Sequence, residues 1–104
     1  MNLTIGALEE IILLLVLREN ESYGAALVKL YIDHMNKEIT LPAVVMVLKR
    51  LEKKGMLKSK MGAPSRERGG RSKVLYKATK LGYNTAEEVL NAKTRIWDMV
   101  PKNS

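Results

Sequence analysis

The fold is decided by one stretch, residues 40–55, which reads TLPAVVMVLKRLEKKG. Thr40 is a natural N-cap and Pro42 is tolerated in a first helical turn, so the stretch predicts a helix over residues 41–54. Gly55 is expected to end this helix as the residue just past its C-terminus, after the basic turn Lys53-Lys54. The apolar face of the helix consists of Val44, Val45, Val47, Leu48 and Leu51.

Two earlier helices are predicted on the N-terminal side of this stretch. The first covers residues 4–19 with Thr4 as its N-cap, and residues 11–17 are apolar on every side. A surface helix shows one apolar stripe, so this helix should be covered on more than one side. A partner subunit would supply the second cover; the alternative is a central helix wrapped by the chain's own elements.

The second helix is expected from Ser22, its N-cap, to residue 32. Residues 36–40 break the helical period and are expected to form a short connecting strand. Two helices joined by a tight connection, with the second capped and basic towards its end, predict a helix-turn-helix.

Strand-like alternation replaces the helical period after Gly55. Strands are expected over residues 56–61 and 72–78, joined by the basic, glycine-rich residues 62–71. Such a hairpin predicts a wing whose tip reaches a phosphate backbone or a minor groove; the alternative is a surface loop with incidental charge. The tip arginines are Arg66, Arg68 and Arg71.

A final helix is predicted from its N-cap, Thr79, to about Val100, and Pro101 ends it. Its long apolar stripe favours helix-against-helix pairing between subunits. The whole chain is therefore expected to be mostly α with a small antiparallel β-hairpin, in the order of a winged helix-turn-helix. Within one compact unit, residues 1–78 would bind DNA and residues 79–104 would dimerise. The stripe consists of Leu81, Ala86, Val89, Leu90, Ala92, Ile96, Trp97 and Val100.

Charge is concentrated in one part of this 104-residue chain. Residues 49–80 hold twelve basic and two acidic side chains, a net of +10, while the remainder holds six basic and nine acidic, a net of −3. One strongly basic segment in an otherwise slightly acidic chain favours a polyanionic partner that binds to one face of the protein. The alternative is an ordinary solvated surface.

Several function classes are excluded by composition. The chain has no cysteine and one histidine, His34, so thiol catalysis, disulfides and a metal site are not expected. No nucleophile motif accompanies its carboxylates, which argues against an enzyme and against a cofactor. Its longest apolar run, residues 11–17, is far shorter than the ~20 residues that cross a bilayer. We therefore expect a soluble, cytoplasmic protein that does not contact the membrane.

Several separate motifs together resemble the PadR family of transcriptional regulators. They fall in the family's order over residues 8–97, and the short C-terminus resembles the compact branch, which has a single C-terminal dimerisation helix. The motifs are Ser22-Tyr23-Gly24, Leu41-Pro42-Ala43-Val44 with residues 47–55, Arg68-Gly69-Gly70-Arg71-Ser72-Lys73, and Tyr76-Lys77-Ala78-Thr79.

This resemblance implies a repressor that binds double-stranded DNA as a homodimer, with the third helix in the major groove and the wing along the backbone. Two-fold symmetry then predicts a pseudo-palindromic operator with half-sites about one helical turn apart. The residues expected to contact DNA are Thr40, Pro42, Ala43, Met46, Lys49, Arg50, Arg66, Arg68, Arg71 and Lys73.

The resemblance also implies a subunit interface between the first and last helices. Some members of the compact branch hold flat aromatic effectors there, beside a tryptophan that corresponds to Trp97; the alternative is that Trp97 only packs the interface. The residues expected at this interface are Leu8, Ile12, Leu15, Val89, Ile96 and Trp97.

Val45 and Met46 depart from the family pattern, which often has tyrosine and a small polar residue at these positions. Neither side chain forms conventional hydrogen bonds with bases, so thymine methyl contacts and DNA shape remain as routes to specificity. A winged-helix protein-interaction module with weak or no DNA binding stays open as an alternative. An RNA-binding winged helix is disfavoured because the hairpin offers only one aromatic residue, Tyr76, for base stacking.

Overall fold

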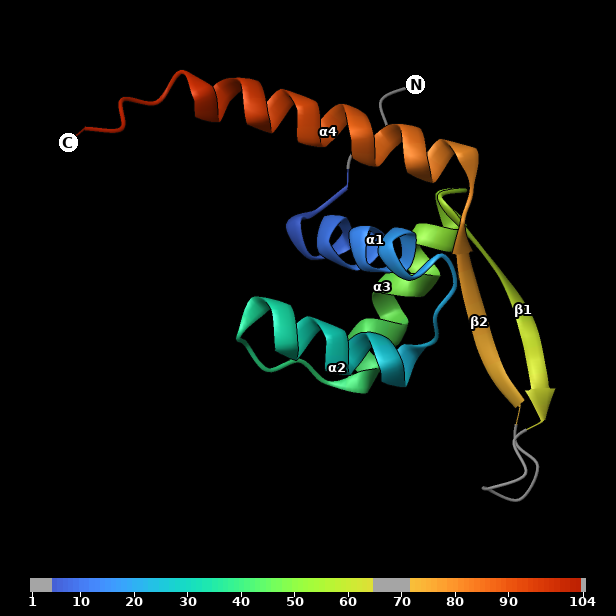
Figure 1. Ribbon diagram of the computed structural model, residues 1–104. Helices are drawn as coiled ribbons and strands as arrows, with labels where there is room; N and C mark the ends of the chain where they lie inside the picture. The colour runs from blue at the N-terminus through green and yellow to red at the C-terminus, as the bar shows by residue number, and fades with distance from the viewer. Residues whose placement is uncertain (1–4, 65–71, 104) are drawn as a thin grey trace.

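The computed structural model describes residues 5–64 and 72–103 (Figure 1). Over these residues the chain forms four helices and one two-stranded antiparallel sheet. Their order confirms the expected winged helix-turn-helix, mostly α with a small hairpin. The elements are α1 (Ala7–Glu19), α2 (Gly24–Met35), α3 (Leu41–Lys53), β1 (Leu57–Pro64), β2 (Ser72–Ala78) and α4 (Lys80–Asp98).

The first helix, α1, lies at the centre and contacts α2, α3, β2 and α4 (Figure 1). Its Ile12, Leu13 and Val16 side chains are completely buried, and each contributes ~1.5–3 kcal/mol by leaving water. The chain's own elements therefore cover much of this all-round apolar helix. Ile12 and Leu15 were expected at a subunit interface, but they are at most 7% exposed and belong to the core of the single chain.

Two helices begin at the N-caps that the sequence predicts. The Thr40 hydroxyl oxygen accepts a hydrogen bond from the Ala43 N–H at 3.3 Å. The Thr79 hydroxyl oxygen accepts one from the Gly82 N–H at 3.1 Å. These side chains satisfy first-turn amides that have no partner within the helix.

The other two helices begin elsewhere. The N-cap of α1 is Gly6, and the predicted cap, Thr4, lies outside the described residues. The N-cap of α2 is Tyr23 rather than Ser22. Ser22 instead forms an isolated antiparallel bridge with Tyr76 on β2, with N–H···O distances of 3.0 and 2.7 Å. The bridge holds Ser22 in an extended conformation, so the helix starts later, and it fastens the start of the helix-turn-helix to the hairpin.

The connection between α2 and α3 is irregular rather than the expected short strand. Asn36 ends α2 in the left-handed region, with φ of 55°. Asparagine tolerates this region better than most residues because its short polar side chain bonds locally. Ile39 then packs against the core and leads into Thr40. The chain thus reverses through a turn, as a helix-turn-helix requires.

The hairpin pairs Leu57 with Ala78 and Ser59 with Tyr76. Alternate strand residues face the same side, and Leu57 and Tyr76 are buried against the helices. β1 continues to Pro64, beyond its predicted end at residue 61. One side of the hairpin therefore belongs to the core, and the other side is left for solvent.

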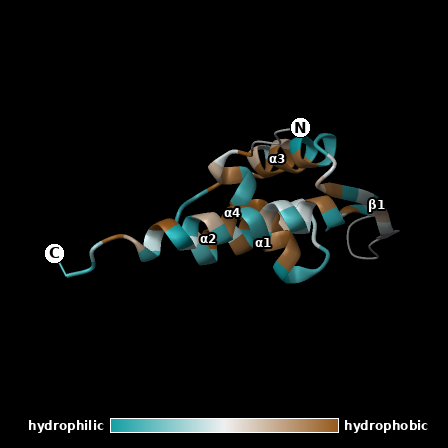
Figure 2. Ribbon diagram, turned by 90° about the horizontal axis from the view of Figure 1, so that it is seen from above, coloured by the Kyte–Doolittle hydropathy of each residue, from teal (hydrophilic) through white to brown (hydrophobic). Residues whose placement is uncertain are grey.

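The last helix, α4, runs beside α1 and then extends past the other helices towards the C-terminus (Figures 1 and 2). Its buried residues, Gly82 and Ala86, lie in its N-terminal half. An ion pair of 2.6 Å between Lys93 and Glu10 adds a link to α1. This extension gives the molecule its long dimension of 56 Å against 33 and 20 Å in the other directions.

A close approach fixes the start of α4 on the turn between α3 and β1. Gly55 adopts a φ of 79° and ends α3 as predicted. The Thr79 hydroxyl donates to the Gly55 carbonyl at 2.6 Å, and the Thr79 N–H donates to the Met56 carbonyl at 3.0 Å. A Cβ atom on Gly82 would overlap the Met56 carbonyl oxygen, so this approach requires glycine at residue 82.

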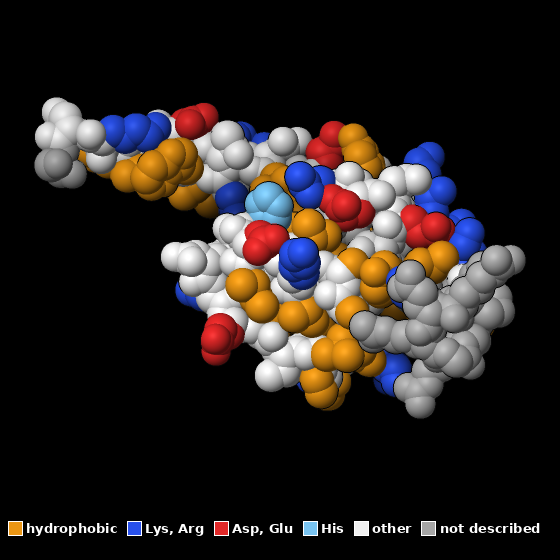
Figure 3. Space-filling view, turned by 60° about the horizontal axis from the view of Figure 1, so that its bottom comes forward, with side chains coloured by type: hydrophobic (Ala, Val, Ile, Leu, Met, Phe, Trp, Pro, Cys, Tyr) orange, Lys and Arg blue, Asp and Glu red, His pale blue; other side chains and the backbone are white. Residues whose placement is uncertain are grey.

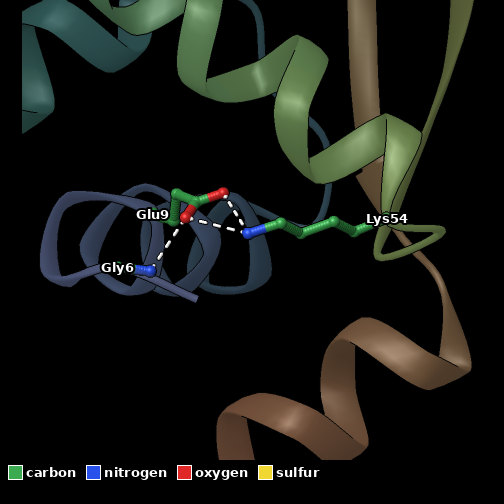
Figure 4. A network of polar contacts seen from close by, with 3 residues as sticks. All are labelled: Gly6, Glu9 and Lys54. Carbon is green, nitrogen blue, oxygen red and sulfur yellow. Dashed lines mark hydrogen bonds and ion pairs between the residues drawn. The ribbon is translucent and has the colours of Figure 1, made fainter. Parts of the chain in front are cut away.

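The first turn of α1 is joined to the end of α3 by a largely buried carboxylate (Figure 4). Glu9 is 8% exposed. It accepts the Gly6 N–H at 2.8 Å and binds the Lys54 ammonium at 2.9 and 3.0 Å. Burial alone would raise the pKa of Glu9, but the Gly6 hydrogen bond and the charges of Lys54 and Arg50 outweigh it and lower the pKa below its ordinary value of 4.5.

Replacing Gly82 by alanine is expected to destabilise the protein. Alanine favours a helix by up to ~1 kcal/mol over glycine, but the overlap with the Met56 backbone should cost more and leave a net loss of about 1–3 kcal/mol. Urea unfolding at one protein concentration measures the loss. The matched control is Gly24→Ala in α2, where the nearest atom is the flexible end of Leu41 at 3.0 Å. Equal stability of Gly82→Ala and the unsubstituted chain would contradict the close approach.

Stability should fall with acid in a way that Glu9→Gln removes. Because the folded state lowers the pKa of Glu9, its contribution is present above 4.5 and is lost as pH falls through the folded pKa. Glu9→Gln should cost about 1–2 kcal/mol at pH 7 and unfold with a weaker dependence on pH in the acid range. Glu88→Gln, an exposed position on α4, is the control. An unchanged acid profile in Glu9→Gln would count against this account.

Candidate nucleic-acid interface

The third helix presents one exposed stripe opposite its buried face. Val44 and Leu51 mark the buried side, where both are fully shielded by the core. Residues three and four apart lie on the same side of a helix. The α3 stripe consists of the exposed residues Pro42, Met46, Lys49 and Lys53.

Most of the residues that the sequence predicts for DNA contact on this helix are accessible. Ala43 is half-buried. Lys53 was missed, although its helical spacing from Met46 and Lys49 is the signal that identifies it. The exposed predicted residues are Thr40, Pro42, Met46, Lys49 and Arg50.

The α3 stripe is apolar at its N-terminal end and cationic towards its C-terminal end. Met46 is 55% exposed, and Leu41 beside the stripe is 46% exposed. Neither these side chains nor Pro42 can donate a hydrogen bond. The first ammonium on the stripe is Lys49, about one turn further along. Apolar contacts and phosphate contacts would therefore come from different ends of one helix.

The hairpin turns a second basic surface to solvent, which we call the hairpin lysines: Lys58, Lys60 and Lys77. Lys58 lies directly opposite Lys77, and both are exposed. Lys60 lies 3.2 Å from the Glu21 carboxylate. Like charges directly opposite each other destabilise a sheet, so an anion bound here would relieve that repulsion. Sequence reasoning missed these residues, because alternation alone does not reveal which lysines a hairpin pairs.

Lys73, predicted as a wing contact, lies where the hairpin meets the helix-turn-helix. Its Nζ atom is 4.2 Å from the centre of the Tyr23 ring at the start of α2. A cation over an aromatic ring at this distance contributes ~0.5–1 kcal/mol at an exposed site. The contact supplements the Ser22–Tyr76 bridge in holding the hairpin beside α2.

Not every cation of the basic segment faces outward. Lys54 forms an ion pair with the largely buried Glu9 carboxylate at 2.9 Å. The Glu52 carboxylate, the acidic group of α3, accepts a hydrogen bond from the Ser59 hydroxyl at 2.6 Å. The outward charge is therefore carried by α3 and the hairpin rather than by the turn between them. Three predicted wing contacts, Arg66, Arg68 and Arg71, lie outside the described residues and stay predictions.

A separate apolar surface lies between α1 and α4. It contains a hollow of about 400 Å³. Sequence reasoning did not single out Leu14 and Leu17, because α1 is apolar all round and its period does not show which side remains open. The apolar lining consists of Leu14, Leu17, Tyr83, Ala86 and Leu90.

The residues expected at a subunit interface do not all lie on this surface. Leu8 and Val89 are half-buried. Ile96 and Trp97 are 64% and 60% exposed on the extended end of α4. With Ile12 and Leu15 in the core, the accessible apolar positions come mainly from α4.

Two kinds of site are not found in the described ranges. No helix within residues 5–64 and 72–103 is long and apolar enough to cross a membrane. Nor do these residues hold a cluster of three or more His, Cys, Asp or Glu side chains that could bind a metal ion.

The exposed helix of a helix-turn-helix, flanked by a basic hairpin that is bridged to it, defines a winged helix-turn-helix protein. No family model and no curated protein sequence matches the chain. Solved structures do match it, and they give the chain a PadR-like fold, as the sequence motifs predicted.

Three of these structures show the extent of the similarity. A PadR family transcriptional regulator from Eggerthella lenta is 26% identical, covers 85% of this chain and 75% of its own, and has a TM-score of 0.68. A transcriptional regulator from Clostridium thermocellum is also 26% identical, with coverages of 89% and 92% and a TM-score of 0.65. Bacillus subtilis PadR, solved in complex with operator DNA, is 16% identical, with coverages of 97% and 51% and a TM-score of 0.69.

Proposed function

We propose that the chain is a DNA-binding transcriptional regulator that places α3 in the major groove and the hairpin beside the phosphate backbone. The observation that carries this proposal is the pairing of two outward basic surfaces on one rigid frame. Lys49, Arg50 and Lys53 lie on α3, and the hairpin lysines lie on the strands. Contacts between α3 and β1 place the two side by side, and the Ser22–Tyr76 bridge ties the hairpin to the start of α2. Lysine and arginine contacts to phosphate supply most of the affinity of such proteins for DNA.

The comparisons support the same proposal. The Bacillus subtilis protein that shares this fold was solved with operator DNA. A winged helix-turn-helix positions its recognition helix by the preceding helix and by the wing. The chain has both supports in place, because α2 contacts α3 and the hairpin adjoins both α1 and α3.

We further propose that two copies associate through α4. A lone chain leaves Ile96, Trp97 and Met99 64%, 60% and 78% exposed at the extended end of this helix. Within the chain the Lys102 ammonium lies 5.3 Å from the centre of the Trp97 ring, and the three side chains remain more than half exposed. A partner's α4 laid along this end and over the hollow between α1 and α4 would remove apolar surface from water.

A two-fold dimer would present two copies of α3, and the proposed target is therefore a pseudo-palindromic operator with half-sites about one helical turn apart. Binding over a promoter would make the protein a repressor. An aromatic effector beside Trp97, in the manner of the compact branch, is part of the same proposal, since the exposed indole offers a flat apolar face.

Duplex binding is expected to weaken steeply with salt. Each phosphate contact contributes a slope of about 0.9 in the logarithm of affinity against the logarithm of salt concentration. The double variant Lys49→Ala/Arg50→Ala should therefore bind random-sequence duplex DNA more weakly and with a slope that is smaller by about two. Fluorescence anisotropy across a salt series measures both quantities.

The matched control for this experiment removes the same charge from the C-terminal end of the chain, in Arg95→Ala on α4 combined with Lys102→Ala just after it, with sedimentation velocity to check that self-association is unchanged. Its slope should equal that of the unsubstituted chain. Negligible binding at low salt would overturn the DNA-binding proposal. It would favour a winged-helix protein-interaction module instead, for which the exposed Leu41 and Met46 side chains would supply an apolar contact surface.

Dimerisation is expected to depend on the exposed end of α4. Ile96→Asp should weaken self-association by at least about 100-fold. The dimer would lose the apolar contact of both isoleucines and would have to bury two unpaired carboxylates. Sedimentation velocity at several protein concentrations measures the change. Ile32→Asp, at an exposed isoleucine of α2, is the control and should remain dimeric. A monomeric unsubstituted chain would contradict the proposed assembly.

A further inference from the structure

The first two turns of α3, the helix proposed to contact base edges, expose a largely apolar surface to solvent. Leu41 is 46% exposed, Met46 is 55% exposed, and Pro42 is exposed between them. Ala43 and Val45 are half-buried beside them. None of these side chains carries an N–H or O–H donor, and the thioether sulfur of Met46 is their one weak hydrogen-bond acceptor.

The four bases differ in how favourably their major-groove edges contact an apolar protein surface. Guanine, adenine and cytosine present donors and acceptors that would lose water without gaining a partner against an apolar side chain. Thymine is the base that adds a methyl group to its major-groove edge. Burying that methyl is favourable by the same hydrophobic effect that stabilises a core.

We propose that α3 reads thymine methyl groups through Met46, with Pro42 next to it on the stripe. This inference rests on the proposed DNA-binding function and names the base chemistry that the site selects. In a helix-turn-helix the N-terminal residues of the recognition helix approach the bases. Met46 lies one turn before the first stripe ammonium, so its thioether would reach the groove floor while Lys49 reaches the backbone.

Charge around the apolar surface favours DNA over an apolar protein partner. The only acidic residue in α3 is Glu52, and it bonds to Ser59 on the hairpin. Figure 3 shows hydrophobic side chains gathered on the face that the view brings forward, with Lys and Arg side chains among and around them and several Asp and Glu side chains on the same face. On α3 itself, an apolar start followed by the exposed cations Lys49, Arg50 and Lys53 complements a major groove, whose floor carries methyl groups and whose walls carry phosphates.

The test compares thymine with deoxyuridine, which pairs in the same way but lacks the methyl group. Duplexes are first selected from a random-sequence pool on the full-length protein, and the best duplex is then made with deoxyuridine in place of every thymine. The selected duplexes should carry thymine at a recurring position. Loss of each contacted methyl should lower affinity about fourfold. The salt slope should not change, because the phosphates are the same.

The variant Met46→Ala assigns the effect to this side chain. Met46 is more than half exposed, so the variant should fold, which its thermal unfolding checks. It should bind the thymine and deoxyuridine duplexes with nearly equal affinity. Met61→Ala, at a 65% exposed methionine of β1, is the control and should keep the discrimination.

Each remaining outcome has a definite meaning. Equal affinity of the unsubstituted protein for both duplexes, with a steep salt dependence, would overturn methyl reading and leave the proposed function standing. Discrimination that persists in Met46→Ala would overturn the assignment to Met46, because the methyl would then be sensed elsewhere or through DNA shape. Failure to bind either duplex at low salt would overturn both proposals.

Discussion

The structure depends on one constraint, the left-handed turn at Gly55 that ends α3. Two elements, α1 and α4, are attached at this turn. Lys54, just before it, binds the Glu9 carboxylate of α1. The carbonyls of Gly55 and Met56 accept the hydroxyl and N–H of Thr79, which begins α4. A residue with a Cβ strains a φ of 79°, so glycine lets the turn form, and the turn then sets the position of α3 against its neighbours.

This arrangement separates the charges that stabilise the fold from those left for a partner. Lys54 is directed inward, where its ion pair lowers the pKa of Glu9. The cations of α3 and the hairpin remain outside, and two of them, Lys58 and Lys77, face each other across the sheet. A protein selected only for stability would avoid that pair. The Lys58–Lys77 pair and the apolar start of the α3 stripe are consistent with the proposed contact with DNA.

Sequence patterns predicted the elements better than their ends. Thr40 and Thr79 were found as N-caps because a side-chain cap is a local interaction that neighbouring residues specify. Ser22 was not a cap, because its backbone pairs with Tyr76, more than fifty residues away. Likewise Ile12 and Leu15 were expected to meet a partner, but contacts with α2, α3, β2 and α4 bury them. Both of these errors came from interactions between distant parts of the chain.

The sequence by itself therefore determined the order of helices and strands, the turn at Gly55, the basic segment and the resemblance to PadR regulators. These features follow from periodicity, capping and composition, which act over a few residues. Only the tertiary structure decided that Lys54 faces Glu9, that Lys58 meets Lys77, and that Ile12 is buried within the single chain. Those outcomes depend on which surfaces come into contact when the chain folds. The hydrophobic period of a helix or strand shows which side is buried, but not which element buries it.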